Sequence, residues 1–313
     1  MGATVTGRRS EEGTVFGVAG GVYQVRLDSG DFVEAALRGR LKQEHRTGDK
    51  VVVGDRVRVG HHGSIWAVDA VAPRTSELVR RGLGGRRAKV VAANVERMLV
   101  VVAARDPDPS LAQVDRLLVV AEASGVHPVL VVNKIDLAGG REVAERLRSL
   151  YERSGYPVLA VSAVTGEGME SLARRLENGT SALVGPSGAG KSSLLNALHP
   201  TLELRTGDLS RKTGRGRHTT VSSRLIPLEC GGTVADTPGF GDVGLWGVEV
   251  DQVAECFPEI RALEEGCRFR GCAHLKEPDC AVRAAVEAGE MAESRYRSYV
   301  ALREESREQK AEG

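Results

Sequence analysis

The chain has 313 residues, of which 27% are charged and 41% hydrophobic, and its formal net charge at pH 7 is +1. This length predicts two or three domains with separate cores, and the composition is typical of a globular protein. A net charge near zero excludes a chain that is basic throughout, so affinity for nucleic acid would come from local patches. No apolar run is long enough to span a bilayer, and residues 1–12 lack the apolar core of a secretion signal. We therefore expect a cytoplasmic protein with no membrane partner.

The first 75 residues are expected to form a small barrel. Five short apolar or alternating runs are separated by turn signals rich in Gly, Asp and Ser, and we predict strands at 14–18, 22–27, 32–37, 51–59 and 64–71. Five strands in about sixty residues predict a closed five-stranded barrel, and the OB-fold is the obvious candidate.

The expected barrel carries two kinds of side chain that suit RNA. The basic ones are Arg38, Arg40, Lys42, Arg46, Lys50, Arg56 and Arg58, and the aromatic ones are Tyr23, Phe32 and Trp66. Exposed aromatic rings can stack on bases while the cations meet the backbone. The same residues would also suit an ordinary barrel with aromatics in its core and charges in solvent. The sequence leaves both interpretations open.

Residues 76–245 are expected to form a second domain that starts with a linker. The segment 76–89 is rich in Gly and Arg and has no apolar period, so we expect a linker. Its arginines either meet phosphates or are solvated; they are Arg80, Arg81, Arg86 and Arg87. From residue 90 on, strands alternate with amphipathic helices, which predicts a parallel sheet covered on both faces. The expected strands are 97–103, 128–132, 158–161, 181–184 and a hairpin of 221–228 with 233–235; the expected helices are 111–124, 141–154 and 169–177.

A phosphate-binding loop follows the strand at 181–184 and fits G-x-x-x-x-G-K-[ST]. The preceding strand and following helix are the context that this motif requires. Its glycines let successive N–H groups converge on phosphate oxygens at a helix N-terminus. Lys191 would reach the β- and γ-phosphates, and the Ser192 hydroxyl would hold Mg²⁺. The residues expected to contact the nucleotide are Gly185, Pro186, Ser187, Gly188, Ala189, Gly190, Lys191, Ser192 and Ser193. A Gly-rich loop that only turns a strand into a helix is the alternative.

Two further strings predict which base is bound. Asn133-Lys134-Ile135-Asp136 matches N-K-x-D at the end of an expected parallel strand, where open α/β sheets bind ligands. The Asp136 carboxylate can accept both the ring N–H and the exocyclic amine of guanine, a pairing that adenine cannot offer. Lys134 would lie along the base plane, and Asn133 would brace the loop. The turn formed by Ser162 and Ala163 would present N–H groups to the guanine O6. These strings predict GTP as the nucleotide.

The order of the strings indicates a circular permutation. Asp236 of the D-T-P-G string would hold Mg²⁺ through a water, and the Gly239 N–H would sense the γ-phosphate. The strings resemble the motifs of translation-factor-like GTPases, but here base recognition precedes the phosphate loop. Such a rearrangement is tolerated where the ends of the original fold lie close together. The segment after Gly239 would then transmit nucleotide state to the C-terminal region.

Residues 246–313 are expected to be helical around a cysteine-rich knot. Cys267, Cys272, His274 and Cys280 offer three thiolates and one imidazole, a complete tetrahedral set for Zn²⁺. Because protein fills all four places, we expect one structural zinc ion. Zinc binding is worth about 10–16 kcal/mol in zinc-finger peptides, enough to fold a segment with little core. Free cysteines near a surface histidine are the alternative.

The whole chain resembles the RsgA (YjeQ) family of circularly permuted GTPases. The resemblance rests on N-K-I-D, G-P-S-G-A-G-K-S, G-R-G-R-H-T-T, D-T-P-G-F, F-G-D-V-G-L-W-G, F-P-E-I and C-R-F-R-G-C-A-H. It implies a barrel that contacts 16S ribosomal RNA, GTP hydrolysis stimulated by the small (30S) ribosomal subunit, and a role late in small-subunit maturation. We also expect a monomer that does not bind DNA, because the zinc segment lacks a basic recognition helix.

The expected catalytic residues are His218, Thr220 and Lys191. Phe240 stands where related GTPases carry a glutamine that orients the attacking water, so the isolated protein should hydrolyse GTP slowly. His218 is the candidate replacement, because imidazole can orient or deprotonate water near neutral pH, and the resemblance also points to it. The alternative is that His218 contacts RNA and affects the rate indirectly. Thr220 is favoured over Thr219 as the residue that closes on Mg²⁺. A GTP-dependent RNA-binding checkpoint, in which hydrolysis serves only release, is the alternative function.

Overall fold

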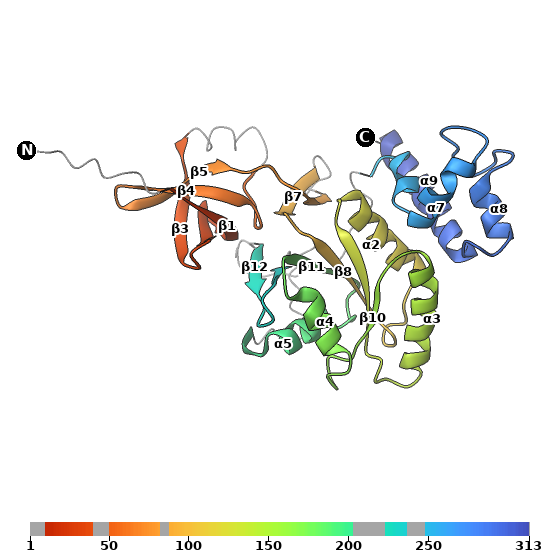
Figure 1. Ribbon diagram of the computed structural model, residues 1–313, viewed down its shortest axis with the longest axis horizontal. Coiled ribbons are helices and arrows are strands. Elements are labelled where there is room, and N and C mark those ends of the chain that lie inside the picture. Colours follow the sequence, from red (N-terminus) through yellow and green to blue (C-terminus); the bar gives the residue numbers. More distant parts are fainter. Residues whose placement is uncertain (1–9, 40–49, 82–87, 203–222, 237–247, 313) are drawn as a thin grey trace, which may run out of the picture.

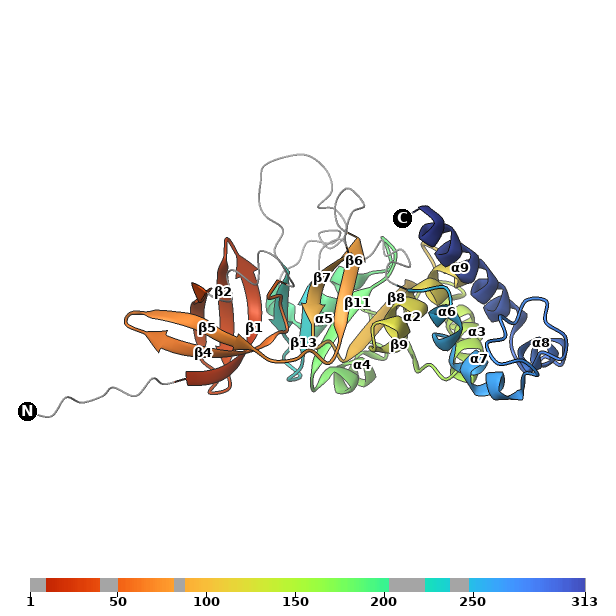
Figure 2. The same cartoon turned by 90° about the horizontal axis from the view of Figure 1, so that it is seen from above.

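The computed structural model describes residues 10–39, 50–81, 88–202, 223–236 and 248–312 (Figure 1). Seen from above, the chain forms three parts in a row: an N-terminal barrel, a central sheet with its helices, and a group of C-terminal helices (Figure 2). In the part of the chain that is described, no helix combines the length and the apolar character needed to cross a bilayer.

The N-terminal part is a closed five-stranded barrel, as predicted. Its strands are β1 (Ser10–Ala19), β2 (Val22–Leu27), β3 (Phe32–Leu37), β4 (Arg56–His62) and β5 (Ile65–Val71). They pair in the order β1-β2-β3-β5-β4, and β4 pairs back onto β1, which is the OB-fold arrangement. Alternate residues of β2 point inward, because successive side chains of a strand face opposite sides. This alternation fills the barrel with its own apolar core.

One barrel strand begins later than the sequence predicted. The apolar run at 51–59 suggested one strand, but β4 starts only at Arg56. Gly54 has a positive φ of 88°, and a Cβ at this position would lie 2.0 Å from the Ala93 carbonyl oxygen. The chain therefore turns here, against the residues that follow the barrel. The buried Asp55 carboxylate holds the turn by accepting from the Val52 N–H at 2.8 Å and from Arg74 Nε at 2.8 Å.

The segment between the two domains is more regular than predicted. We expected a linker at 76–89, but β6 (Glu77–Arg81) and β7 (Ala88–Ala93) form an antiparallel pair. Leu78 is fully buried in the main core, which gives β6 an apolar anchor on the central domain. The arginines expected to meet phosphates in this segment (Arg80, Arg81, Arg86 and Arg87) have side chains outside the described part of the chain.

The central sheet has the predicted alternation of strands and helices. Its strands are β8 (Arg97–Ala103), β9 (His127–Asn133), β10 (Val158–Ala160), β11 (Thr180–Val184), β12 (Arg224–Pro227) and β13 (Thr233–Asp236). They lie in the order β10-β9-β8-β11-β13-β12, parallel except for β12. One core packs α2 (Leu111–Ala123) and α3 (Gly140–Arg153) on the sheet, and another packs α4 (Met169–Leu176) and α5 (Lys191–Leu198). Because all the parallel strands end at one edge, the predicted ligand loops lie together there.

The barrel and the central sheet are joined by a strand pairing. β12, the outermost strand of the central sheet, pairs antiparallel with β1 of the barrel, where Gly17 lies opposite Arg224. The eleven strands therefore form one continuous hydrogen-bonded sheet. β12 is also the antiparallel partner of β13, which ends at Asp236, so the barrel is connected to the strand that carries this residue.

The C-terminal part consists of helices that pack on the central domain. They are α6 (Gln252–Glu255), α7 (Pro258–Leu263), α8 (Ala281–Glu287) and α9 (Glu293–Glu312), with short 3₁₀ turns at Glu264–Gly266 and, earlier in the chain, at Pro200–Leu202. α9 packs against α2, and both contribute to the main core. The Ser306 hydroxyl of α9 also donates to the Val248 carbonyl oxygen at 2.7 Å. The packing of α9 on α2 fixes the C-terminal helices to the central domain, and the Ser306 bond joins α9 to the start of the C-terminal part.

A fully buried arginine strengthens this junction. Arg295 of α9 donates to Asp115 of α2 at 2.6 Å and, through Nε, to Glu259 of α7 at 2.7 Å. The Tyr151 hydroxyl of α3 donates to the same Asp115 oxygen at 2.8 Å. The guanidinium also lies 4.5 Å from the centre of the Phe257 ring, where a cation is attracted to the aromatic face. One side chain thus connects helices of two domains.

We expect Arg295→Ala to destabilise the protein by about 3–5 kcal/mol, because it leaves two carboxylates in the junction without their cation. Urea unfolding measures this loss. Arg297→Ala is the matched control on the same helix, since its pair with Glu293 is exposed and worth at most about 1 kcal/mol. Equal losses for the two variants would contradict the role given to Arg295.

Candidate functional site

The phosphate-binding loop leaves β11 and curls around a lysine. Gly185, Gly188 and Gly190 all have positive φ angles, and a Cβ at Gly185 would lie 2.0 Å from the Val101 carbonyl oxygen. The buried Lys191 Nζ donates to the carbonyl oxygens of Gly185 at 2.6 Å and Pro186 at 2.9 Å. The ammonium group is thereby held beneath the loop at the start of α5. This geometry suits phosphate oxygens, which would meet both a cation and a helix N-terminus.

Asn133 links the first expected base loop (residues 133–136) to the phosphate loop (residues 185–193). It is the last residue of β9 and is 2% exposed. Its Nδ2 donates to the Ala189 carbonyl oxygen at 3.0 Å, and its Oδ1 accepts from the Ala163 N–H at 3.2 Å. A Cβ at Gly190 would lie 2.2 Å from Asn133 Nδ2, so glycine is needed where the two loops meet. The structure therefore brings three of the predicted motifs together.

The remaining residues of the base loop have distinct environments. Lys134 has a positive φ of 64°, and its ammonium donates to the Asp106 carbonyl oxygen. Ile135 is buried beneath the loop, whereas Asp136 is exposed and free to meet a ligand from solvent. This arrangement agrees with a carboxylate that reads a base edge.

The Ser162–Ala163 turn differs from the expectation in one respect. We expected its N–H groups to face the guanine O6, but the Ser162 N–H donates to the Glu167 carbonyl oxygen at 2.9 Å, and the Ala163 N–H donates to Asn133. A contact with O6 would therefore share or replace one of these bonds. The 3.2 Å bond from Ala163 is the longer of the two.

Two oxygen ligands suited to Mg²⁺ lie at the same edge of the sheet. Ser192 is buried at the start of α5, and Asp236 is the last residue of β13, the parallel neighbour of β11. The Oδ1 atom of Asp236 is buried without a hydrogen-bond partner among the described residues, and its Oδ2 atom accepts from Arg224 Nε at 3.3 Å. A hydroxyl and a carboxylate are ligands that Mg²⁺ prefers, with waters completing its shell. These residues therefore fit the ion.

Several predicted residues lie outside the described part of the chain. They are His218, Thr219, Thr220, Gly239 and Phe240. The roles assigned to them, as well as the nucleotide contacts assigned to the loop residues, stay predictions.

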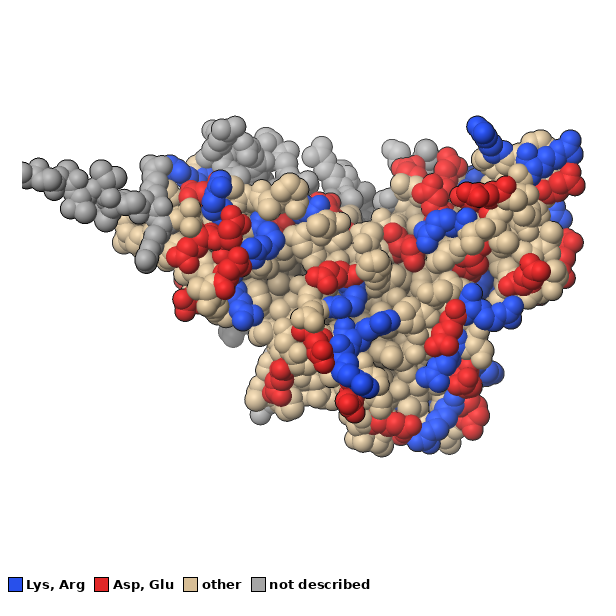
Figure 3. All heavy atoms as spheres, viewed as in Figure 1, with Lys and Arg blue, Asp and Glu red and all other residues tan. Residues whose placement is uncertain are grey.

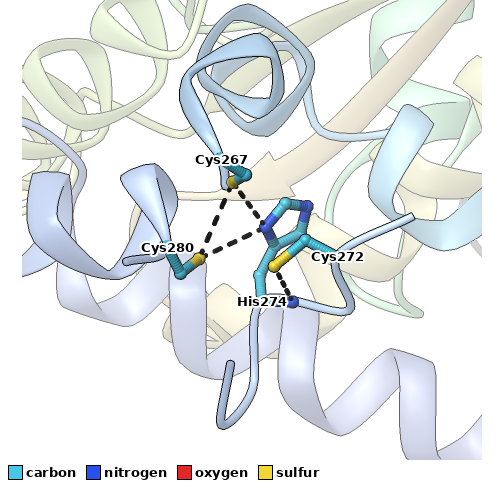
Figure 4. A group of neighbouring side chains, drawn as sticks. All are labelled: Cys267, Cys272, His274 and Cys280. Carbon is cyan, nitrogen blue, oxygen red and sulfur yellow. Dashed lines mark hydrogen bonds between the residues drawn. The ribbon is translucent and has the colours of Figure 1, made fainter. Parts of the chain in front are cut away.

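The predicted zinc ligands form a compact cluster (Figure 4). The ligand atoms of Cys267, Cys272, His274 and Cys280 all lie within 4.8 Å of one another. His274 Nδ1 lies 3.6 Å from the Cys267 sulfur and 3.4 Å from the Cys280 sulfur, and these two sulfurs are 3.9 Å apart. Tetrahedral zinc with Zn–S bonds of about 2.3 Å would separate two sulfur ligands by about 3.8 Å. The geometry therefore fits a structural Zn²⁺.

Burial acts in opposite directions on the two kinds of ligand in the cluster. Burial raises the pKa of the Cys272 thiol to about 12, and burial lowers the pKa of His274, so the imidazole stays neutral near pH 7. A bound cation deprotonates its thiol ligands and takes a neutral imidazole. Two tyrosines of α9 hold the loop, since Tyr296 and Tyr299 donate to the carbonyl oxygens of His274 and Ala273, each at 2.7 Å. These two hydroxyls thus tie the loop that carries the expected zinc ligands to α9.

The aromatic residues of the barrel are divided between core and surface. Tyr23 lies in the barrel core, which agrees with the ordinary interpretation, and Trp66 packs on that core and edge-on against His61. Phe32 is 50% exposed and available for stacking. On the face drawn in Figure 3, basic and acidic side chains are interspersed.

The basic residues of the barrel divide in the same way. Arg56 pairs with Asp28, and Arg38 pairs with Asp69. Lys50 and Arg58 are exposed, while Arg40, Lys42 and Arg46 lie outside the described residues. The described part therefore offers a limited cationic surface.

Sequence reasoning missed Arg224. The Arg224–Asp236 pair depends on the register of the β12–β13 hairpin, in which these two residues lie opposite each other. A hairpin that ends in D-T-P-G could have suggested that its first strand supplies a neighbour to the aspartate.

These features define a class of protein. A three-layer domain in which the N-K-x-D string precedes the phosphate loop is a circularly permuted P-loop GTPase. The family model described as RsgA GTPase matches residues 71–246, and the chain belongs to this family.

Individual relatives agree with this assignment over the whole chain. The "Small ribosomal subunit biogenesis GTPase RsgA" of Gemmatimonas aurantiaca is 50% identical over 95% of this chain and 97% of its own length. Its counterpart of the same name from Geobacillus kaustophilus is 42% identical over 96% and 98%. The crystal structure of YjeQ from Thermotoga maritima matches with a TM-score of 0.81 and 33% identity, covering 95% of this chain and 99% of that one. The structure of YloQ, titled a circularly permuted GTPase, matches with a TM-score of 0.76 and 30% identity, covering 98% and 99%.

We expect purified protein to contain one zinc ion per chain and Cys280→Ser to lose it, because serine is a poor replacement for a thiolate ligand. Zinc retained after dialysis against a chelator, together with the thermal unfolding curve, measures the effect. Cys230→Ser is the control, since Cys230 lies apart from the cluster and should leave the zinc content unchanged. Full zinc retention by Cys280→Ser would refute this ligand set.

Proposed function

We propose that this protein hydrolyses GTP to GDP and phosphate when it binds the small (30S) ribosomal subunit, and that it acts late in the assembly of that subunit. The observation that supports the nucleotide part most strongly is the contact of Asn133 with both the phosphate loop and the Ser162–Ala163 turn. This contact joins the loops that we expect to read guanine and to bind phosphate. The ribosomal part is supported by the relatives, whose name assigns them to small-subunit biogenesis.

The residues expected around the phosphates would have separate roles in binding and in hydrolysis. The Lys191 ammonium donates to two loop carbonyl oxygens in this structure and would donate to the β- and γ-phosphates when nucleotide is bound. Ser192 would bind Mg²⁺ directly and Asp236 through a water, and the ion would neutralise charge on the phosphates. His218 would orient the attacking water, a task that the apolar Phe240 cannot perform. The isolated protein would therefore turn over slowly.

The ribosomal subunit would contact the protein through its outer parts. The barrel offers the exposed Phe32, Lys50 and Arg58 as groups that could meet 16S RNA by stacking and by charge. Since β1 of the barrel pairs with β12, an RNA contact there would reach the strand that leads to Asp236. This connection gives a physical route by which a bound subunit could raise the rate of hydrolysis.

Phosphate release with and without purified small subunits tests the proposal. We expect small subunits to raise the turnover of the native protein strongly, and we expect His218→Ala to lose about 10²-fold or more of the stimulated rate while it keeps its affinity for GDP. His127→Ala, at the opposite end of β9 from the site, is the matched control and should behave like the native protein.

Three outcomes are informative. Stimulated turnover that is unchanged in His218→Ala would remove the catalytic role of this residue. Turnover that does not respond to small subunits would overturn the ribosomal part. GTP-dependent binding to small subunits, with hydrolysis serving only to release the protein from them, would favour the RNA-binding checkpoint instead.

A further inference from the structure

The pairing of Arg224 with Asp236 places a permanently charged side chain beside the expected magnesium ligand. The two residues lie opposite each other on β12 and β13, and Arg224 Nε is 3.3 Å from Asp236 Oδ2. The Asp236 side chain is only 12% exposed, whereas that of Arg224 is 50% exposed. The carboxylate is therefore held in place by the sheet, and the arginine is the partner that can move away.

The same carboxylate has a second, unused oxygen. Asp236 Oδ1 is buried and has no hydrogen-bond partner among the described residues. A carboxylate that gives one oxygen to an arginine attracts a further cation less strongly, because the two positive charges repel each other at close range. The guanidinium cannot lose its charge in a protein, so pH does not relieve this repulsion.

We propose that Arg224 competes with Mg²⁺ for Asp236, so that the ion binds together with nucleotide only as the arginine gives up its pair. The proposal rests on the use of this site for Mg²⁺ and a guanine nucleotide. Arg224 is a positioning residue, since it acts on the ion through Asp236. An ion pair with an exposed arginine is a weak interaction. We therefore expect the arginine to weaken Mg²⁺ binding by about two- to fivefold.

The position of Arg224 gives the competition a structural consequence. Arg224 is also the residue of β12 that pairs with Gly17 of the barrel strand β1. When its side chain leaves Asp236, the guanidinium is released at the seam between the barrel and the central sheet. Occupation of the magnesium site would thus change the charge presented at this seam without any movement of the strands.

The test measures how Mg²⁺ tightens the binding of fluorescently labelled GDP. Titration of Mg²⁺ at fixed nucleotide gives a half-saturating concentration, and binding in the presence of a chelator gives the affinity without the ion. We expect Arg224→Gln and Arg224→Met to lower the half-saturating Mg²⁺ concentration by about two- to fivefold and to leave binding in chelator unchanged. Arg224→Lys keeps the charge and should stay closer to the native value.

Arg148→Gln is the matched control, because Arg148 also forms an exposed pair, with Glu145 on α3, far from the magnesium ligands in the sequence. It should leave both measurements unchanged. An unaltered or increased Mg²⁺ requirement in the two neutral variants, with native unfolding curves, would overturn the competition. Failure of the native protein to bind GDP at all would instead refute the nucleotide site on which the proposal rests.

Discussion

The side chain of Asn133 holds together the parts of the site that the permuted chain supplies separately. Its amide nitrogen donates to Ala189 in the phosphate loop, and its amide oxygen accepts from Ala163 in the second base loop. The Asn133 side chain is buried, and a buried polar group left without a partner costs about 1–3 kcal/mol, so the loss of either contact would be costly. The two expected base loops and the phosphate loop, which lie far apart in the chain, are therefore joined through one side chain.

The two outer parts are attached to the central domain in different ways. The barrel joins it through backbone hydrogen bonds between β1 and β12, next to the strand that carries Asp236. The C-terminal helices join it through side chains, with Arg295 at the centre of a buried ionic contact to Asp115. A strand pairing can shift with its neighbours, whereas a buried ion pair resists separation. The barrel is thus joined to the hairpin that carries Asp236, whereas the expected transmission through the segment after Gly239 lies outside the described residues and stays a prediction.

Most of the fold and much of the site could be predicted from local patterns. The strand at Arg97–Ala103 is a continuous apolar run, and the phosphate loop, base loops and zinc ligands have motifs with fixed spacing. The β6–β7 pair was missed because β6 contributes a single buried leucine, too short a pattern to predict a strand. Tyr23 could not be placed, since an inward strand residue and a stacking aromatic look alike in sequence. Arg295 and Asp115 are 180 residues apart, and only the packed helices bring them together.

A calorimetric titration of GDP into the native protein and into Asn133→Ala tests most directly whether one side chain unites the site. The account predicts binding of one GDP per native chain and a loss of affinity of tenfold or more in Asn133→Ala, equivalent to about 1.4 kcal/mol or more. Asn178→Ala replaces an exposed asparagine of the same domain and should bind GDP like the native protein. A folded Asn133→Ala variant with native affinity for GDP would contradict the account.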